Sequence, residues 1–90
     1  MNRYEKYVAG LGFTKPKQGR TKTEDVVGLT FEACDVQKAA KILGKCKYYK
    51  PNLFVYKIAS DKAIRIDTLR HRILLANSKT AVKALLRTVL

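Results

Sequence analysis

The spacing of apolar residues predicts a short helix at the start of the chain, over residues 2–11. Asn2 is a suitable N-cap. The apolar side chains recur at the helical spacing i, i+3, i+4, i+7, at Tyr4, Tyr7, Val8 and Leu11. Glycines bracket its end at positions 10 and 12, where one glycine would suffice as a cap. The pair indicates a close approach of another backbone.

Strand patterns and a second helix follow. Residues 14–23 carry four basic residues and no acid, and a proline and a glycine interrupt any helix, which predicts an exposed edge strand or a basic loop. Residues 26–33 are rich in β-branched and aromatic side chains and predict a strand. Asp35 is a suitable N-cap for a helix that ends at Gly44 and has an apolar stripe of Val36, Ala39, Ala40 and Leu43.

The next segment predicts a hairpin. Residues 45–49 alternate, with Lys45, Lys47 and Tyr49 on one side, and a turn at residues 50–52 leads into residues 53–59. That second strand is apolar on both faces, which is typical of a strand covered on at least one side.

Residues 61–75 fit two interpretations. As a helix capped by Ser60, they place Ala63, Ile66, Leu69 and Ile73 on one face. As a meander, residues 63–67 and 71–76 are two further strands. We predict the helix, because residues 68–70 lack a turn signal. Ser78 is then the N-cap of a final amphipathic helix.

Together these elements predict one α+β domain over residues 1–90. Ninety residues allow a single modest core. Two helices separated by hairpins can lie on one face of a four-stranded antiparallel sheet. The other face of the sheet is then left for solvent or ligand.

Charge narrows the expected partners. The net charge is +12 at pH 7, and from residue 36 to residue 60 every charge is positive. Self-repulsion of this size is relieved by a bound polyanion, most commonly nucleic acid. An anionic membrane and an acidic protein surface are the alternatives. No apolar run reaches the roughly 18 residues that a membrane span needs, and the charged N-terminus does not resemble a signal peptide. We therefore expect a cytoplasmic protein.

Signatures of enzymes are sparse. The sequence has neither a Walker-type phosphate loop nor a dinucleotide fingerprint. His71 lies between two arginines without a paired nucleophile. Glu24 and Asp25 could hold a divalent ion, but a solvated turn explains them better. Cys34 and Cys46 are too far apart for a Cys-x-x-Cys site, and we expect two half-buried reduced thiols. We expect no catalytic residue, metal, cofactor or small-molecule substrate.

Basic and aromatic residues gather in two places, the loop over residues 14–23 and the hairpin over residues 45–57. Lysines neutralise phosphates by releasing counterions, and glutamine and arginine also reach base edges. A curved β-ribbon fits the major groove of DNA. The nucleic-acid contacts predicted from this pattern are Lys15, Lys17, Gln18, Arg20, Lys22, Lys45, Lys47, Tyr49, Lys50 and Lys57.

Several strings resemble the LAGLIDADG homing endonucleases. Residues 7–11, YVAGL, resemble the Leu-Ala-Gly-Leu half of the family's helix, and residues 29–60 resemble its second strand, middle helix and following hairpin. Residues 74–86, LLANSKTAVKALL, resemble its C-terminal segment. The resemblance implies an αββαββα saddle that lies in the major groove and pairs with a second unit through the first helix. In a homodimer, that contact would use Tyr4, Val8, Ala9, Gly10, Leu11 and Gly12.

One departure from the family bears on catalysis. The family places a metal-binding acid just after the Leu-Ala-Gly-Leu string. Here residues 12–14 are Gly-Phe-Thr, and the first acid after the string is Glu24. A metal-activated water therefore has no evident holder. The resemblance then implies a unit that binds without cleaving, such as a regulatory relic.

We therefore predict a non-enzymatic protein that binds nucleic acid, duplex DNA rather than RNA. Two alternatives stay open. One is a small phage-type inhibitor that binds a host protein through the same basic face. The other is a metal-dependent nuclease that uses Asp25 or Glu24.

Overall fold

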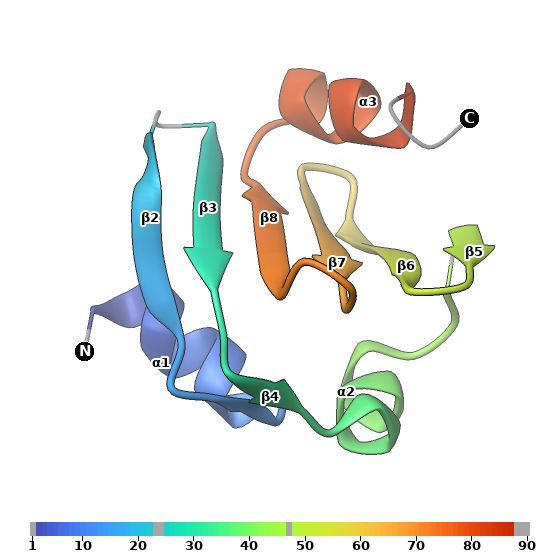
Figure 1. Cartoon of the computed structure of the whole chain (residues 1–90). Helices are drawn as coiled ribbons and strands as arrows, with labels where there is room; N and C mark the ends of the chain where they lie inside the picture. The colour runs from blue at the N-terminus through green and yellow to red at the C-terminus, as the bar shows by residue number, and fades with distance from the viewer. Residues whose placement is uncertain (1, 23–24, 47, 88–90) are drawn as a thin grey trace.

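The computed structural model describes residues 2–22, 25–46 and 48–87, which form an α+β fold (Figure 1). Six strands of this part of the chain form one antiparallel sheet in the order β2-β3-β8-β7-β6-β5, and β1 pairs with β4 in a separate two-stranded sheet. The predicted α+β class is therefore confirmed, and the predicted count of four strands is too low. The elements are α1 (Arg3–Gly10), β1 (Phe13–Thr14), β2 (Lys17–Lys22), β3 (Val26–Thr30), β4 (Ala33–Cys34), α2 (Val36–Leu43), β5 (Tyr48–Lys50), β6 (Leu53–Ala59), β7 (Lys62–Asp67), β8 (Arg72–Ala76) and α3 (Lys79–Arg87).

The three helices begin at the predicted caps. Asn2 and Glu5 form a reciprocal capping box on α1. The Asp35 carboxylate accepts the backbone N–H of Lys38 at 3.1 Å, and the Ser78 hydroxyl oxygen accepts that of Ala81 at 3.1 Å. Each cap satisfies a backbone donor that the helix itself leaves unpaired. No helix in these described ranges is long and apolar enough to span a membrane.

The helix predicted over residues 61–75 is wrong, because this segment forms the hairpin β7–β8. Pairing across the hairpin places Ile64 opposite Leu75 and Ile66 opposite Ile73. The turn closes without glycine or proline. The Asp67 carboxylate accepts the N–H groups of Leu69 and Arg70 at 3.0 and 2.9 Å, and His71 adopts a φ of 56°. Aspartate supplies this kind of turn through its own side chain.

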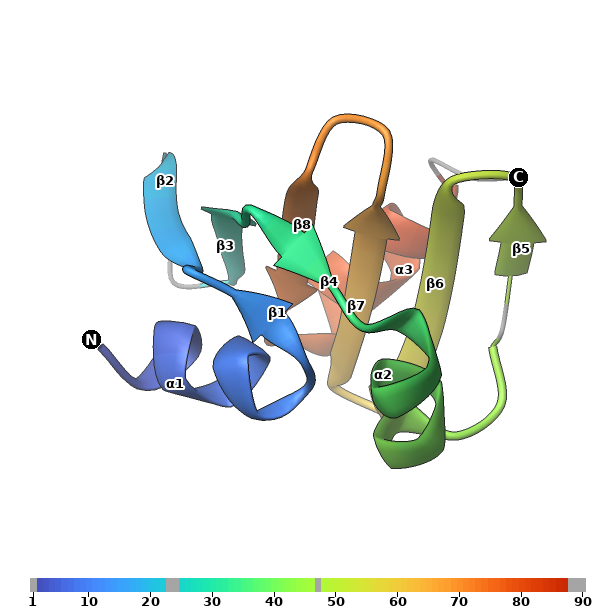
Figure 2. The ribbon, with the colours of Figure 1, turned by 60° about the horizontal axis from the view of Figure 1, so that its bottom comes forward.

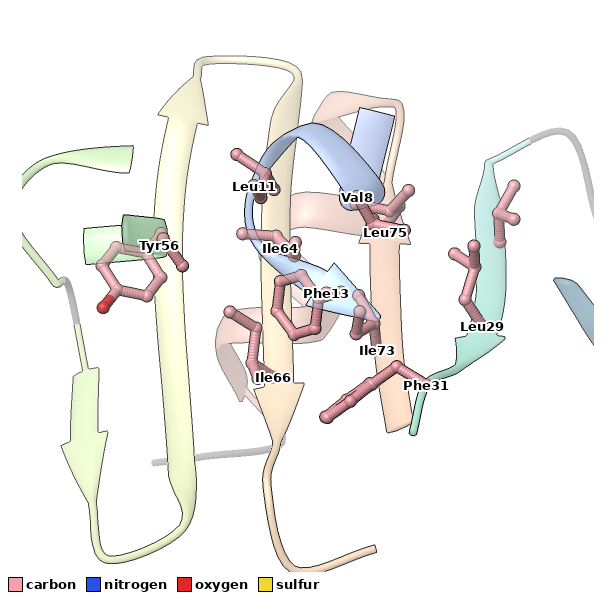
Figure 3. Packing of buried hydrophobic residues seen from close by; sticks show 12 residues of the cluster. Val8, Leu11, Phe13, Leu29, Phe31, Tyr56, Ile64, Ile66, Ile73 and Leu75 are labelled. Carbon is pink, nitrogen blue, oxygen red and sulfur yellow. The ribbon is translucent and has the colours of Figure 1, made fainter. Parts of the chain in front are cut away.

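Helices lie on both faces of the sheet, which corrects the expectation that they share one face (Figure 2). We call the face under α1, α2 and the β1–β4 pair the covered face. The opposite face, on which α3 packs at one end, is called the open face. Side chains on the covered face form the main core with Val8, Leu11 and Phe13 (Figure 3). The strand residues of this core include Leu29, Tyr56, Ile64, Ile66, Ile73 and Leu75.

A smaller cluster joins α3 to the open face. It contains Ala63 and Ala76 from the sheet, and Ala81, Val82 and Leu85 from the helix. Because Ala63 pairs with Ala76, the helix packs over two small side chains at one end of β7 and β8. The other end of these strands is left without a helix over it.

The two cysteines are half-buried thiols, as predicted. Burial, with a smaller contribution from the Asp35 carboxylate, raises the pKa of the Cys34 thiol. The Cys46 thiol donates to the carbonyl oxygen of Val55 at 3.4 Å. Both side chains pack against the main core.

Candidate nucleic-acid interface

The open face carries a row of paired residues across all six strands of the sheet, and all of them except Leu53 are polar. Directly paired residues of antiparallel strands lie on the same face. Arg72 and Asp67 are paired, and each has an isoleucine of the main core beside it in its own strand. Since side chains alternate along a strand, Arg72 and Asp67 belong to the open face. Successive pairs define the whole row, which runs Lys17, Thr30, Arg72, Asp67, Leu53 and Lys50.

A hollow of about 450 Å³ lies beside this row. Gly19 and Gly28 line it on β2 and β3, where the absence of side chains leaves room above the backbone. Its charged lining is three arginines and one acid: Arg65, Arg70, Arg72 and Asp67. The hollow therefore has an excess of positive charge, which suits an anionic ligand.

The one acid in the hollow is engaged by its own turn. One Asp67 oxygen accepts two backbone N–H groups of the β7–β8 turn. The other lies 3.7 Å from a guanidinium nitrogen of Arg70, whose side chain is 69% exposed. The Asp67 side chain is 18% exposed, but the 3.7 Å separation is long and the Arg70 end is in solvent, so the pair is worth only about 1 kcal/mol. Arg70 can therefore exchange Asp67 for a phosphate at little cost.

Three of the predicted contacts lie on the open face or at its edge, and a fourth, Lys45, lies on the connection that leaves α2 on the covered face. Lys17 and Lys50 belong to the row described above, and both are exposed. Lys57 pairs with Ala63, which places it on the same face at the edge of the area that α3 covers. Lys45 is exposed in the loop between α2 and β5, because β5 begins only at Tyr48.

Two other predicted contacts are engaged elsewhere. Gln18 pairs with Leu29 of the main core, and therefore lies on the covered side of the sheet. Its side-chain oxygen accepts the Asn2 amide, and its backbone N–H donates to Glu5 at 3.1 Å. The Lys15 ammonium pairs with the Glu32 carboxylate at 3.3 Å. Gln18, our candidate for base contacts, instead fastens β2 to the start of α1.

The remaining predicted contacts cannot be assigned to a surface. Lys47 lies outside the described residues. The backbones of Arg20, Lys22 and Tyr49 lie in β2 and β5, and their side chains fall outside the described part of the structure.

Sequence reasoning missed the three arginines of the hollow. Because residues 61–75 were predicted as a helix, the prediction did not place these arginines on one face of the sheet. The alternation Ala-Ile-Arg-Ile-Asp over residues 63–67 was the available signal, since it places Arg65 and Asp67 together opposite the two isoleucines. The pairing of β7 with β8 then adds Arg72 to the same side.

The residues predicted for a homodimer contact are largely used within the chain. Val8 and Leu11 are 0% and 2% exposed in the main core, and Tyr4 packs against it. The predicted close approach of a backbone occurs at Gly12, within the same chain: a Cβ there would lie 3.2 Å from the Asp35 carbonyl oxygen. Ala9 is half-buried and Gly10 is exposed. A contact between two copies through α1 would therefore use its outer side.

Two of the residues considered for catalysis, His71 and Asp25, make contacts that join segments of the fold. The His71 ring stacks on Phe31 with centroids 5.2 Å apart, and its carbonyl oxygen accepts the Phe31 N–H at 3.2 Å. The Asp25 carbonyl oxygen accepts the Asn77 N–H at 2.8 Å, and Glu24 lies outside the described residues. Within the described ranges, no three His, Cys, Asp or Glu side chains come together as a metal site would need.

Comparison with models of known protein families, with curated proteins and with solved structures found no match to this chain. The open face and its charges are therefore the features of the chain that bear on function.

Proposed function

We propose that this protein binds duplex DNA through the open face of its sheet and does not cleave it. The observation that carries the proposal is the hollow of about 450 Å³ with three arginines, beside a row of paired residues that ends in lysines at both edges of the sheet. Phosphates take most protein–DNA hydrogen bonds, and arginine and lysine supply many of them. A sheet face is an established way to enter a DNA groove.

The shape of the open face supports duplex DNA over RNA. The row from Lys17 to Lys50 crosses six strands, which at about 4.8 Å per strand spans roughly 24 Å. That length matches several successive phosphates along a B-form groove. The deep, narrow major groove of A-form RNA excludes side chains. A single-stranded or duplex RNA preference is an outcome that the experiment below distinguishes.

A link to the LAGLIDADG family forms part of the proposal. Without the β1–β4 pair and the β5–β6 hairpin, the elements run α1, β2, β3, α2, β7, β8, α3, which is the order αββαββα. The four strands are then adjacent in the sheet. The position of α3 on the open face departs from a saddle backed by helices on one side only. We propose a binding-only regulatory relic, paired through the outer side of α1.

Two double variants with equal net charge test the interface. Lys17→Gln with Arg72→Gln removes two cations from the open face. Lys38→Gln with Lys41→Gln removes two exposed cations from α2, on the other side of the sheet. Affinity for duplex DNA, duplex RNA and single-stranded RNA is measured by fluorescence anisotropy as a function of salt. If about five phosphates are contacted, the wild-type log–log slope is about −4.5.

The open-face variant is expected to reduce the steepness of the salt slope by about two, and the α2 variant to leave it unchanged. Equal effects of the two variants would show that net charge acts without a defined face. Absence of binding to DNA and RNA at low salt would refute the proposal. It would leave an acidic protein surface as the partner that the charge suits.

A further inference from the structure

Leu69, in the β7–β8 turn, is a largely exposed apolar residue. It is 73% exposed, compared with 54% for Ile42 on α2. The turn extends beyond the neighbouring end of β6 (Figure 2). A single exposed apolar residue is common on protein surfaces and needs no explanation by itself. Leu69 differs from such residues in the contacts that hold its turn and in the arginines next to it.

The turn that carries Leu69 is braced from three directions. Asp67 accepts its backbone N–H groups from within. The N–H of Thr68 donates to the carbonyl oxygen of Asn52 at 2.9 Å, which ties the tip to the β5–β6 turn. His71 stacks on Phe31 and accepts its N–H, which ties the other side to the end of β3. The leucine is therefore presented on a rigid support, so that little conformational entropy is lost on binding.

The same turn places positive charge next to the leucine. Arg70 follows Leu69 directly, and Arg72 is the first residue of β8. Both guanidinium groups line the hollow of the open face. A polyanion held in that hollow would bring its backbone against these arginines and close to the exposed leucine that precedes them in the turn.

We propose that Leu69 is a wedge that inserts between two stacked base pairs and kinks the DNA held by the open face. This inference rests on the proposed binding of duplex DNA. Proteins that kink DNA from the minor groove insert apolar side chains such as leucine, contact the groove with arginine and lysine, and bend the duplex by about 20–90°. The preferred substrate is then a duplex with an easily unstacked step, such as TA or CA/TG, at one position.

The test compares bending with binding in the full-length chain. A duplex of about 25 base pairs carries a donor and an acceptor dye at its ends, so that a kink raises energy transfer. Leu69→Ala removes the wedge, and Leu69→Phe keeps an apolar wedge. Ile42→Ala is the matched control, because it truncates another exposed aliphatic residue away from the open face. Circular dichroism verifies that each variant folds.

Wild type, Leu69→Phe and Ile42→Ala are expected to raise energy transfer on binding. Leu69→Ala is expected to bind with the same salt slope and without the increase. A single mismatch lowers the cost of unstacking. Wild type should therefore prefer a mismatched duplex by about tenfold over a matched one, and Leu69→Ala should lose that preference.

The outcomes separate this inference from the proposed function. If wild type binds DNA without bending it, or if Leu69→Ala bends it equally, the wedge is refuted while the binding face stands. If wild type binds no duplex at any salt concentration, the proposed function fails and the wedge fails with it.

Discussion

The covered and open faces of the sheet are built by alternate residues of the same strands. On β7 and β8, Ile64, Ile66, Ile73 and Leu75 enter the main core. Their immediate neighbours Arg65, Asp67 and Arg72 line the hollow on the other side. A five- or six-residue strand therefore contributes to stability with one set of positions and to a candidate site with the other. The two sets can change almost independently.

The faces differ in what covers them. Two helices and the β1–β4 pair seal one face with large aliphatic and aromatic side chains. On the other face α3 packs over Ala63 and Ala76, and reaches only one end of the central strands. The uncovered part of that face carries Arg65, Asp67 and Arg72. Incomplete cover, together with the glycines on β2 and β3, makes the hollow.

The sharpest test of this division uses two adjacent residues of β8. Ile73 is 1% exposed in the main core, whereas Arg72 is exposed on the open face. Ile73→Ala is expected to lower the free energy of unfolding by about 2–5 kcal/mol, because it removes buried methyl groups and leaves a cavity. Arg72→Ala is expected to change it by less than about 0.5 kcal/mol. Urea unfolding followed by circular dichroism measures both.

Small domains have free energies of unfolding of about 5–15 kcal/mol, so Ile73→Ala alone removes a large part of the stability of the fold. Similar losses in the two variants would show that the open face also supports the fold. The separation of core and site positions would then be wrong.

The two glycines at the end of α1 provide a second, smaller contrast. Gly12 has a φ of +107°, and a Cβ there would lie 3.2 Å from the Asp35 carbonyl oxygen. Gly12→Ala is therefore expected to cost about 1–3 kcal/mol through backbone strain and crowding against the start of α2. A Cβ on Gly10 meets nothing within 4 Å. Because Gly10 is helical, Gly10→Ala is expected to stabilise the chain by about 0.5–1 kcal/mol.

Thermal unfolding of the two alanine variants gives the comparison directly. If Gly12→Ala were neutral, the contact of the α1–β1 connection with α2 would not help to close the covered face. If Gly10→Ala were destabilising at low protein concentration and more so at high concentration, a contact between copies would use that position.

Local signals in the sequence predicted the helices well. Asn2, Asp35 and Ser78 cap the three helices that the apolar spacing indicated, and the hairpin after residue 50 follows its turn residues. Each of these elements is specified by residues a few positions apart. The helix predicted over residues 61–75 failed because its apolar spacing fits both periods. Pairing with β3 favours the strand over the helix here. Leu29 and its neighbours on β3 pair with β8 residues that are more than forty positions away in the sequence.

The candidate site was less predictable than the fold for the same reason. Lys17 and Lys50 were predicted as contacts, yet the row that joins them depends on the registers of five strand pairs. No residue spacing within one element reveals that Arg72 lies beside Thr30 and Asp67. Gln18 shows the reverse error, because its polar side chain suggested an external partner and instead meets Asn2. Net charge favours a polyanionic partner as a prediction, but it does not indicate which surface would bind it.

The weakest expected effect concerns the rim of the covered face, where one carboxylate joins α1 to β2. Glu5 accepts the backbone N–H groups of Asn2 at 2.8 Å and Gln18 at 3.1 Å. These hydrogen bonds favour the charged form and hold the pKa of Glu5 below its ordinary value of 4.5. The unfolded chain therefore binds a proton at this site more readily than the folded chain does. Its stabilisation is fully present above pH 4.5 and is lost as the pH falls through the lowered pKa.

Glu5→Gln should therefore lower the melting temperature near neutral pH, and the difference from wild type should shrink as the solution is acidified below 4.5. Lys6→Gln is the control, since it introduces the same amide on the same helix without removing a carboxylate. A difference for Glu5→Gln that stayed constant down the acid range would mean that the contact acts through shape rather than charge. If the difference disappears at acid pH, the charged Glu5 carboxylate stabilises the edge of the covered face, where it joins α1 to β2.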